Sequence, residues 1–395
     1  MEMLILRRKG SGGLEGAHVP VGTGAEIEAV FQDLSPSEVR DLPRDDNILC
    51  ATEPIPLMLI EPVSVSDVVM TPPAAEEVTW GVKAVGASTS PFTGKGVTVA
   101  VLDTGIDKSH AAFSGVEIIG RNFTNGDPQD FNDTDSHGTH CAGTIFGRAV
   151  NGTQIGVAPG ITKAVIGKVL GPGGGSTGTL FTAINWAIEN KAHIISMSLS
   201  MDLVGYRERL VAQGFHPKQA TSQAMRVLID NVRFYDKFGN LLRSGAAFGR
   251  SALVLAASGN ESDRFGDRFD GAPFFLATAY PAATEDFVSV AALEQTGDSF
   301  NPYKVANFSN AGAKIAGPGV GIVSAIPGGG LDSKSGTSMA TPHIAGVAAL
   351  WAQKIMLSGA FTAEKVLDRL KSSSQIPPGL DEADVGVGIP QAPQS

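Results

Sequence analysis

The sequence predicts an α/β fold with a doubly wound, mostly parallel β-sheet and helices on both faces. Two observations lead to this prediction. From Trp80 onward, short apolar runs alternate with longer segments whose apolar residues recur at helical spacing. Nearly continuous apolar runs are typical of parallel strands covered on both faces, and strand–helix alternation is typical of a doubly wound sheet.

The elements of this domain can be assigned in chain order. We expect buried strands over five apolar runs, at 96–103, 163–170, 192–200, 251–258 and 285–293. Helical spacing of apolar residues predicts helices over 139–148, 178–191, 222–238 and 339–354. This order produces the strand–helix alternation on which the fold prediction depends.

The N-terminal part has a different character. A short strand over 3–7, a helix over 24–34 and an apolar end over 48–63 predict a small α+β domain. Paired prolines and acidic residues follow, which predicts a linker. The chain is therefore expected to divide into three parts, residues 1–65, 66–79 and 80–395.

Composition excludes several classes of function. The chain has 395 residues, 43% of them hydrophobic, and a net charge of −10, which argues against nucleic acid or an anionic membrane as a partner. The longest apolar runs are too short to span a membrane. The apolar run at 3–6 is too short for a signal peptide, so we expect a cytoplasmic protein. Cys50 and Cys141 form no disulfide framework.

Four polar side chains stand at the carboxyl ends of predicted strands or the starts of helices, where such sheets concentrate function. Asp103 ends the first strand and Asn260 follows the fourth. His137 and Ser338 stand at helix starts. Ser338 could simply cap its helix. Alternatively, a His that accepts its proton and an Asp that orients the His would make it a nucleophile, with Asn260 donating to an oxyanion.

Three segments favour the second interpretation. They resemble, in the same order, the signature segments of the subtilisin-like serine proteases: "VAVLDTGID" (99–107), "SHGTHCAGT" (136–144) and "SGTSMATPHIAGVAAL" (335–350). The segments "GVAPG" (156–160) and "AASGN" (256–260) match further landmarks of that family. The similarity extends over about residues 80–390.

The resemblance implies a reaction and a role for each residue. Asp103 would be the orienting acid, His137 the general base and Ser338 the nucleophile. Asn260 and the Ser338 backbone N–H would form the oxyanion hole. The implied reaction is hydrolysis of peptide bonds through an acyl-enzyme, with no cofactor.

Substrate binding follows from the same resemblance. In the family an extended peptide pairs with two backbone segments, and the pocket for the residue before the scissile bond has a floor. The matching residues here are Gly173, Gly174, Gly175, Ser198, Leu199, Ser200 and Ala279. Ser200 and Met201 replace a usual pair of glycines, and no charge adjoins Ala279. A hydrophobic or small residue is therefore expected before the scissile bond. The insertion at 201–222 either recognises substrate or is a tolerated surface loop.

Metal binding is expected to differ from that of secreted members of the family. Residues 111–113, "AAF", stand where an aspartate calcium ligand is usual, and the loop at 151–160 is shortened. We therefore expect the strong calcium site to be absent and no metal among the site residues, which leaves room for a weaker cation site elsewhere. Cys141, one helical turn after His137, is either a buried small hydrophobe or an oxidant-sensitive thiol.

The N-terminal part resembles, by position and pattern, the propeptide domain of the family, which assists folding and occupies the cleft with its last strand. Residues 56–63 would supply that strand, and the linker would contain the maturation site, cleaved by the enzyme itself. An independent binding module is the alternative for residues 1–65.

The function expected from these observations is that of an autoprocessed serine endopeptidase. Its partners would be a protein or peptide substrate and its own propeptide, not nucleic acid or a membrane. Two alternatives remain. One is a narrowly specific intracellular protease that processes a precursor peptide, and the other is a catalytically silent subtilase that acts as a binding partner.

Overall fold

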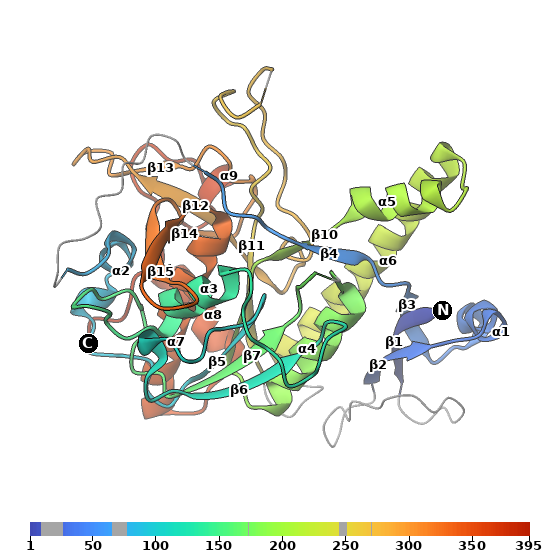
Figure 1. The fold of residues 1–395 in the computed structure, drawn as a ribbon, viewed down its shortest axis with the longest axis horizontal. Helices are drawn as coiled ribbons and strands as arrows, with labels where there is room; N and C mark the ends of the chain where they lie inside the picture. The colour runs from blue at the N-terminus through green and yellow to red at the C-terminus, as the bar shows by residue number, and fades with distance from the viewer. Residues whose placement is uncertain (9–26, 65–76, 173, 245–250, 270) are drawn as a thin grey trace.

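The computed structural model describes residues 1–8, 27–64, 77–172, 174–244, 251–269 and 271–395. Its centre is a sheet in the order β13-β12-β11-β9-β5-β7-β6, with β14 also paired to β12 (Figure 1). Every pairing in this sheet is parallel except that between β12 and β13. The strands are β5 (Thr98–Asp103), β6 (Glu117–Asn122), β7 (Lys163–Lys168), β9 (Ile194–Met197), β11 (Leu253–Ala257), β12 (Val288–Gln295), β13 (Tyr303–Val305) and β14 (Ile315–Pro318). The five predicted strands and the doubly wound fold are confirmed.

Helices cover both faces of this sheet, because alternate residues of each strand point to opposite sides. In β5, Val99 and Val101 pack in one core, and Ala100 and Leu102 pack in the other. The first core lies under α3 (His137–Phe146), α7 (Thr337–Ser358) and α8 (Ala363–Ser373). The second lies under α4 (Thr177–Glu189) and α6 (Pro217–Ser244). The four predicted helices correspond to α3, α4, α6 and α7.

The N-terminal part begins with a separate antiparallel sheet in the order β2-β1-β3. Its elements are β1 (Glu2–Arg8), β2 (Ile27–Asp33), α1 (Pro36–Asp41) and β3 (Ile48–Thr52). The predicted helix over 24–34 is wrong where the structure describes it, since 27–33 is a strand. Phe31 packs toward the core under α4 and α6, whereas Val30 is buried on the opposite face, which is the two-residue period of a strand.

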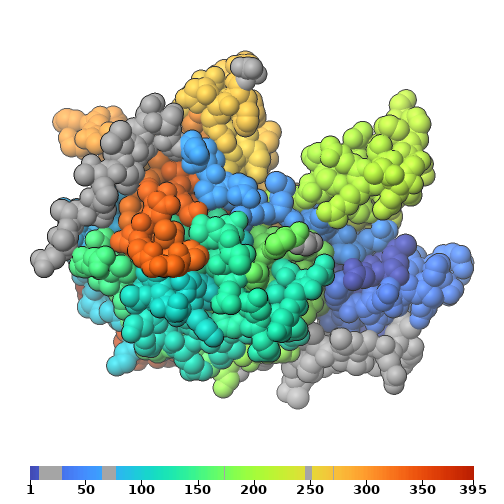
Figure 2. Space-filling view, in the orientation of Figure 1, coloured from blue at the N-terminus to red at the C-terminus, as the bar shows by residue number. Residues whose placement is uncertain are grey.

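A segment leaves this sheet and runs beside the main domain; we call residues 53–63 the arm. The arm contains β4 (Pro56–Leu59), which lies between β8 (Gly175–Ser176) and β10 (Leu199–Met201) and is antiparallel to both. Figure 2 shows it as a blue band between the yellow loops and a yellow-green helical hairpin.

That hairpin is formed by α5 (Leu203–Ala212) and the long helix α6, and it projects beside the arm (Figure 1). It includes the insertion expected at 201–222. The remaining elements are α2 (Trp80–Ala84), β15 (Ile322–Ala325), β16 (Leu331–Lys334), α9 (Glu382–Val385) and the 3₁₀ turns Leu42–Arg44, Ala87–Thr89 and Ala111–Phe113.

In the part of the chain that the structure describes, no single helix is long and apolar enough to cross a membrane. Only the pair α7 and α8, which is bent by 120°, meets the criteria of length and composition together.

Candidate active site

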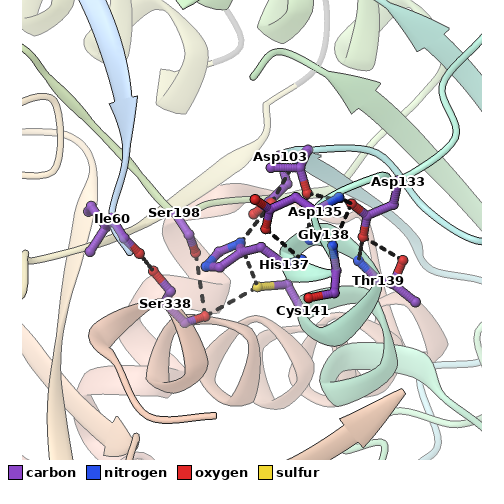
Figure 3. Close-up of polar contacts among 12 residues, drawn as sticks. Ile60, Asp103, Asp133, Asp135, His137, Gly138, Thr139, Cys141, Ser198 and Ser338 are labelled. Atoms are coloured by element: carbon purple, nitrogen blue, oxygen red, sulfur yellow. Dashed lines mark hydrogen bonds and ion pairs between the residues drawn. The ribbon is translucent and has the colours of Figure 1, made fainter. Parts of the chain in front are cut away.

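The structure brings Asp103 and His137 into direct contact (Figure 3). Asp103 is the last residue of β5 and His137 the first residue of α3, and both side chains are buried. His137 Nδ1 lies 2.7 Å from Asp103 Oδ1, which also accepts the Thr104 N–H at 2.8 Å. A Cβ at Gly138 would collide with the Gly105 carbonyl oxygen, so glycine allows α3 to begin this close to β5.

The environment of His137 differs from that of the two neighbouring signature histidines. Burial alone lowers the pKa of an imidazole, but the Asp103 carboxylate outweighs this effect and raises the pKa of His137 well above 6.5. His140 and His343 have no such partner, and burial lowers their pKa values to about 3 and about 4. His137 therefore holds a proton on its ring far more readily than the other two.

Ser338 lies near this pair, at the start of α7 (Figure 3). The N-cap of α7 is Gly336, so the interpretation of Ser338 as the helix cap is wrong. Its hydroxyl leaves the helix and donates to the carbonyl oxygen of Ile60 at 2.9 Å. Within the described residues, His137 Nε2 is buried without a hydrogen-bond partner. The ring nitrogen that a serine hydroxyl would use is therefore unoccupied.

Asn260 follows β11 and is held in one orientation. Its Oδ1 accepts hydrogen bonds from the Thr337 backbone N–H at 2.9 Å and from the Thr337 hydroxyl at 2.8 Å. Its Nδ2 therefore points the opposite way and donates to the Glu61 carbonyl oxygen at 2.8 Å. An amide held in this orientation has its N–H available to an oxygen beside Ser338.

The arm fills the space in front of these residues. Leu57 pairs with Gly175 and with Met201, and Leu59 pairs with Leu199. The Ile60 N–H then donates to the Ser198 carbonyl oxygen at 3.4 Å. The arm is thus the middle strand of a three-stranded sheet that ends at Ser338.

The substrate-binding residues expected from the sequence fall into three groups. Gly175, Ser198, Leu199 and Ser200 belong to the backbone segments that flank the arm. Gly174 and Ala279 make no backbone pairing with the arm; Gly174 lines a cavity of about 440 Å³ beside it, and the Ala279 N–H donates to the Ser258 carbonyl oxygen. Gly173 lies outside the described residues.

Asp133 is a positioning residue that the sequence reasoning missed. It accepts the Thr139 N–H at 2.8 Å, the Ser136 N–H at 3.0 Å and the Thr104 hydroxyl at 2.9 Å, which ties the start of α3 to the end of β5. Burial opposes the charged form, but the hydrogen bonds donated by Thr139 and its neighbours hold the pKa of Asp133 below its usual value. In the sequence, Asp133 stands three residues before Ser136, the N-cap of α3, so no capping pattern identified it.

Cys141 packs beneath the site. Its Sγ lies 3.4 Å from the Ser338 carbonyl oxygen and 3.8 Å from His137 Nδ1, and burial raises the pKa of the thiol. Asp103, His137 and Cys141 are also the one group of three potential metal ligands, among the described residues, whose ligand atoms lie within 4.8 Å of one another. Within this group, the His137 nitrogen and the Asp103 oxygen are already joined by a hydrogen bond.

Comparison with known proteins agrees with this geometry. A model of the subtilase family matches residues 94–388. The chain is 35% identical over 262 residues to an intracellular serine protease of Paenibacillus polymyxa, covering 65% of this chain and 67% of that protein. It is 30% identical over 305 residues to subtilisin of Bacillus pumilus, covering 76% and 92%, and 36% identical over 286 residues to alkaline elastase YaB of Bacillus sp. (strain YaB), covering 71% and 61%. The chain therefore belongs to the subtilase family and is a serine endopeptidase.

Proposed function

We propose that this serine endopeptidase hydrolyses peptide bonds through an acyl-enzyme formed on Ser338. His137 Nε2 takes the proton of the Ser338 hydroxyl as it attacks, and Asp103 stabilises the imidazolium that results. Asn260 Nδ2 and the Ser338 backbone N–H stabilise the developing oxyanion. The observation that carries the proposal is the Asn260 Nδ2 hydrogen bond to a carbonyl oxygen of an extended segment that ends beside Ser338.

We further propose that residues 1–65 are a propeptide that keeps the enzyme inactive. The arm occupies the position of a substrate, and the Ser338 hydroxyl is engaged by the Ile60 carbonyl oxygen. The bond after the Glu61 carbonyl leads to Pro62. The leaving group of this bond would be the Pro62 nitrogen, which carries a ring carbon in place of a hydrogen. The bond therefore resists cleavage.

Maturation is then expected within 66–79, most of which lies outside the described residues. Because the arm fills the cleft of its own chain, this cleavage requires either release of the arm or a second molecule. The alternative for residues 1–65, a binding module independent of proteolysis, would leave the arm in place in the active enzyme.

The proposed substrates carry a hydrophobic or small residue before the scissile bond. Support comes from the buried Ser200 and Met201, and from the absence of a charged residue beside Ala279 in the sequence. One similar relative is named an intracellular serine protease. This name favours action inside the cell. The partner in the proposed function is a protein or peptide substrate rather than nucleic acid or a membrane, and narrowly specific processing of a precursor remains the alternative.

No cofactor takes part in the proposed reaction. Residues 111–113 form a 3₁₀ turn with no carboxylate, which supports the expectation that the strong calcium site of secreted relatives is missing. A chelator should therefore leave the melting temperature of the purified protein unchanged. A large decrease would reveal a structural cation.

The experiment that tests the proposed function compares the wild type with Ser338→Ala by intact mass, N-terminal sequencing and labelling with a fluorophosphonate. We expect the wild type to acquire a new N-terminus within 66–79 and to take up the probe, while Ser338→Ala stays full length and unlabelled. If the wild type remains full length and unlabelled, and a variant with a weakened arm such as Leu57→Ala does too, the silent subtilase would be favoured.

A further inference from the structure

The helical hairpin α5–α6 contacts the start of the arm, several residues before the point at which the arm reaches Ser338. Asn231 lies inside α6 with its side chain fully buried. Its Nδ2 donates to the Glu53 carbonyl oxygen at 2.8 Å and to the Thr52 hydroxyl at 2.9 Å, and its Oδ1 accepts the Thr177 hydroxyl at 2.8 Å. A buried amide with these partners fixes the path by which a chain enters the cleft.

The contacts continue toward the cleft through backbone atoms of the arm. The Ile55 N–H donates to the Thr177 hydroxyl at 2.9 Å, and the Ile55 carbonyl oxygen accepts the Thr177 N–H at 2.8 Å. The Pro56 carbonyl oxygen accepts the Asp202 N–H at 2.8 Å. Because these contacts use the backbone of the arm, another extended peptide that follows the same path can make them too.

One contact depends on the side chain. The Glu53 carboxylate accepts hydrogen bonds from Tyr206 at 3.2 Å, from Gln223 at 3.4 Å and from Arg226 at 3.4 Å. Burial and the nearby carboxylate raise the pKa of Tyr206 to about 12, so the phenol keeps its proton and remains a donor. An Asp230 carboxylate oxygen lies 3.8 Å from the Arg226 guanidinium and competes with Glu53 for it. The hydrogen bonds from Tyr206 and Gln223 to Glu53 are unaffected by Asp230.

We propose that α5–α6 is a substrate-binding site that selects a carboxylate nine residues before the scissile bond. Glu61 is counted as the first residue before that bond, because its carbonyl oxygen accepts the hydrogen bond from Asn260 Nδ2. Glu53 is then the ninth. The substrate class is a protein or precursor peptide whose cleavage site is preceded by an extended segment with Asp or Glu at this distance. This inference rests on the proposed function, because the arm must leave before a substrate can take its place.

The test uses the wild-type protein, expressed as the full chain and incubated until its hydrolysis of a short fluorogenic peptide reaches a constant rate. Two longer peptides share the cleavage site and differ only in Glu or Lys at the ninth position. We expect kcat/KM for the Glu peptide to exceed that for the Lys peptide by about 3- to 10-fold, the range for a partly exposed charge site. Arg226→Glu should abolish this preference.

Arg233→Glu is the matched control. Arg233 lies on the same helix and also pairs with Asp230, but it is more exposed, and within the described residues it forms no hydrogen bond or ion pair with Glu53. The control should keep the wild-type preference for the Glu peptide. Equal hydrolysis of the Glu and Lys peptides by the wild type, or the same loss of preference in Arg226→Glu and Arg233→Glu, would overturn the inference.

A second measurement does not depend on activity. In the full chain carrying Ser338→Ala, Glu53→Lys and Arg226→Glu should each lower the melting temperature, by about 1–3 °C for a partly exposed pair, and the double variant should recover most of that loss. Failure of the short peptide to be hydrolysed would reject the proposed function alone, and the melting experiment would still test the recognition of Glu53 by Arg226 on which the inference rests. A double variant no more stable than the single variants would overturn it.

Discussion

Replacing Leu57 in the arm by Ala should open the site to reagents from solution. The Leu57 side chain is 5% exposed and packs in the core under α4 and α6. Met58, the next residue of β4, is 43% exposed and supplies a control on the same strand. If the arm blocks Ser338, the fraction of molecules with the arm released sets the rate at which a probe reacts.

The size of the effect follows from burial. Truncation of a buried Leu to Ala costs about 2–5 kcal/mol in a core. Leu57 lies near the end of a single strand, so we take the lower limit, about 2 kcal/mol, as the loss in arm binding. That loss raises the released fraction by about 30-fold. Met58→Ala should change it by less than about 3-fold, since little buried area is lost.

The assay is the rate of fluorophosphonate labelling of the full-length protein, followed by intact mass before any processing occurs. We expect Leu57→Ala to be labelled about 30-fold faster than the wild type, and Ser338→Ala to remain unlabelled. Equal labelling rates in wild type, Leu57→Ala and Met58→Ala would refute the reasoning, because the arm would then not control access to Ser338.

Three further predictions concern the chemistry of the site. Pro62→Ala should create a slow cleavage after Glu61, detected by intact mass, because the bond at the oxyanion donor then has an ordinary N–H leaving group, although Glu61 is not the hydrophobic or small residue proposed for substrates; absence of a fragment that ends at Glu61 after prolonged incubation would argue against this register. Asn260→Ala should lower kcat by about 10²–10³ with little change in KM, and a change confined to KM would contradict its role as oxyanion donor. Because protonated His137 cannot accept a proton and its pKa is raised, labelling should be absent at low pH and appear above pH 6.5. Asp103→Asn should move this midpoint to lower pH, since the largest influence that raises the pKa of His137 is removed, and slow the reaction by up to about 10⁴-fold; a midpoint that stays in place would reject this account of the pKa.

The strands of the main sheet were predictable because they are buried on both faces. Every residue of β5 and β11 is buried, so each strand is marked in the sequence by a nearly continuous apolar run. The strand β2 was not predictable in the same way. Its apolar residues Ala29, Val30 and Phe31 fit a helix about as well as a strand, and only pairing with β1 decides between them.

The candidate site was predictable as a set of residue types but not as an arrangement. Asp103, His137 and Ser338 stand out because each ends or begins an element in a recognisable segment. Asp133 was missed, because its positioning role depends on hydrogen bonds donated from the end of β5 and the start of α3, which only the fold brings together. The sequence left substrate recognition by the insertion at 201–222 as one of two alternatives, and it could not predict the contact between Glu53 and Arg226, which are 173 residues apart.

The sequence by itself determined the family, the α/β fold and the residue types needed for a serine hydrolase, because these depend on local runs, periodicity and short segments. Only the tertiary structure decided which carbonyl oxygen faces Asn260 and which carbonyl oxygen accepts the hydrogen bond of the Ser338 hydroxyl. The hydrogen bond between Ser338 and Ile60 joins residues 278 positions apart. Such a contact depends on how the arm pairs with β8 and β10, and no local pattern along the chain encodes that register.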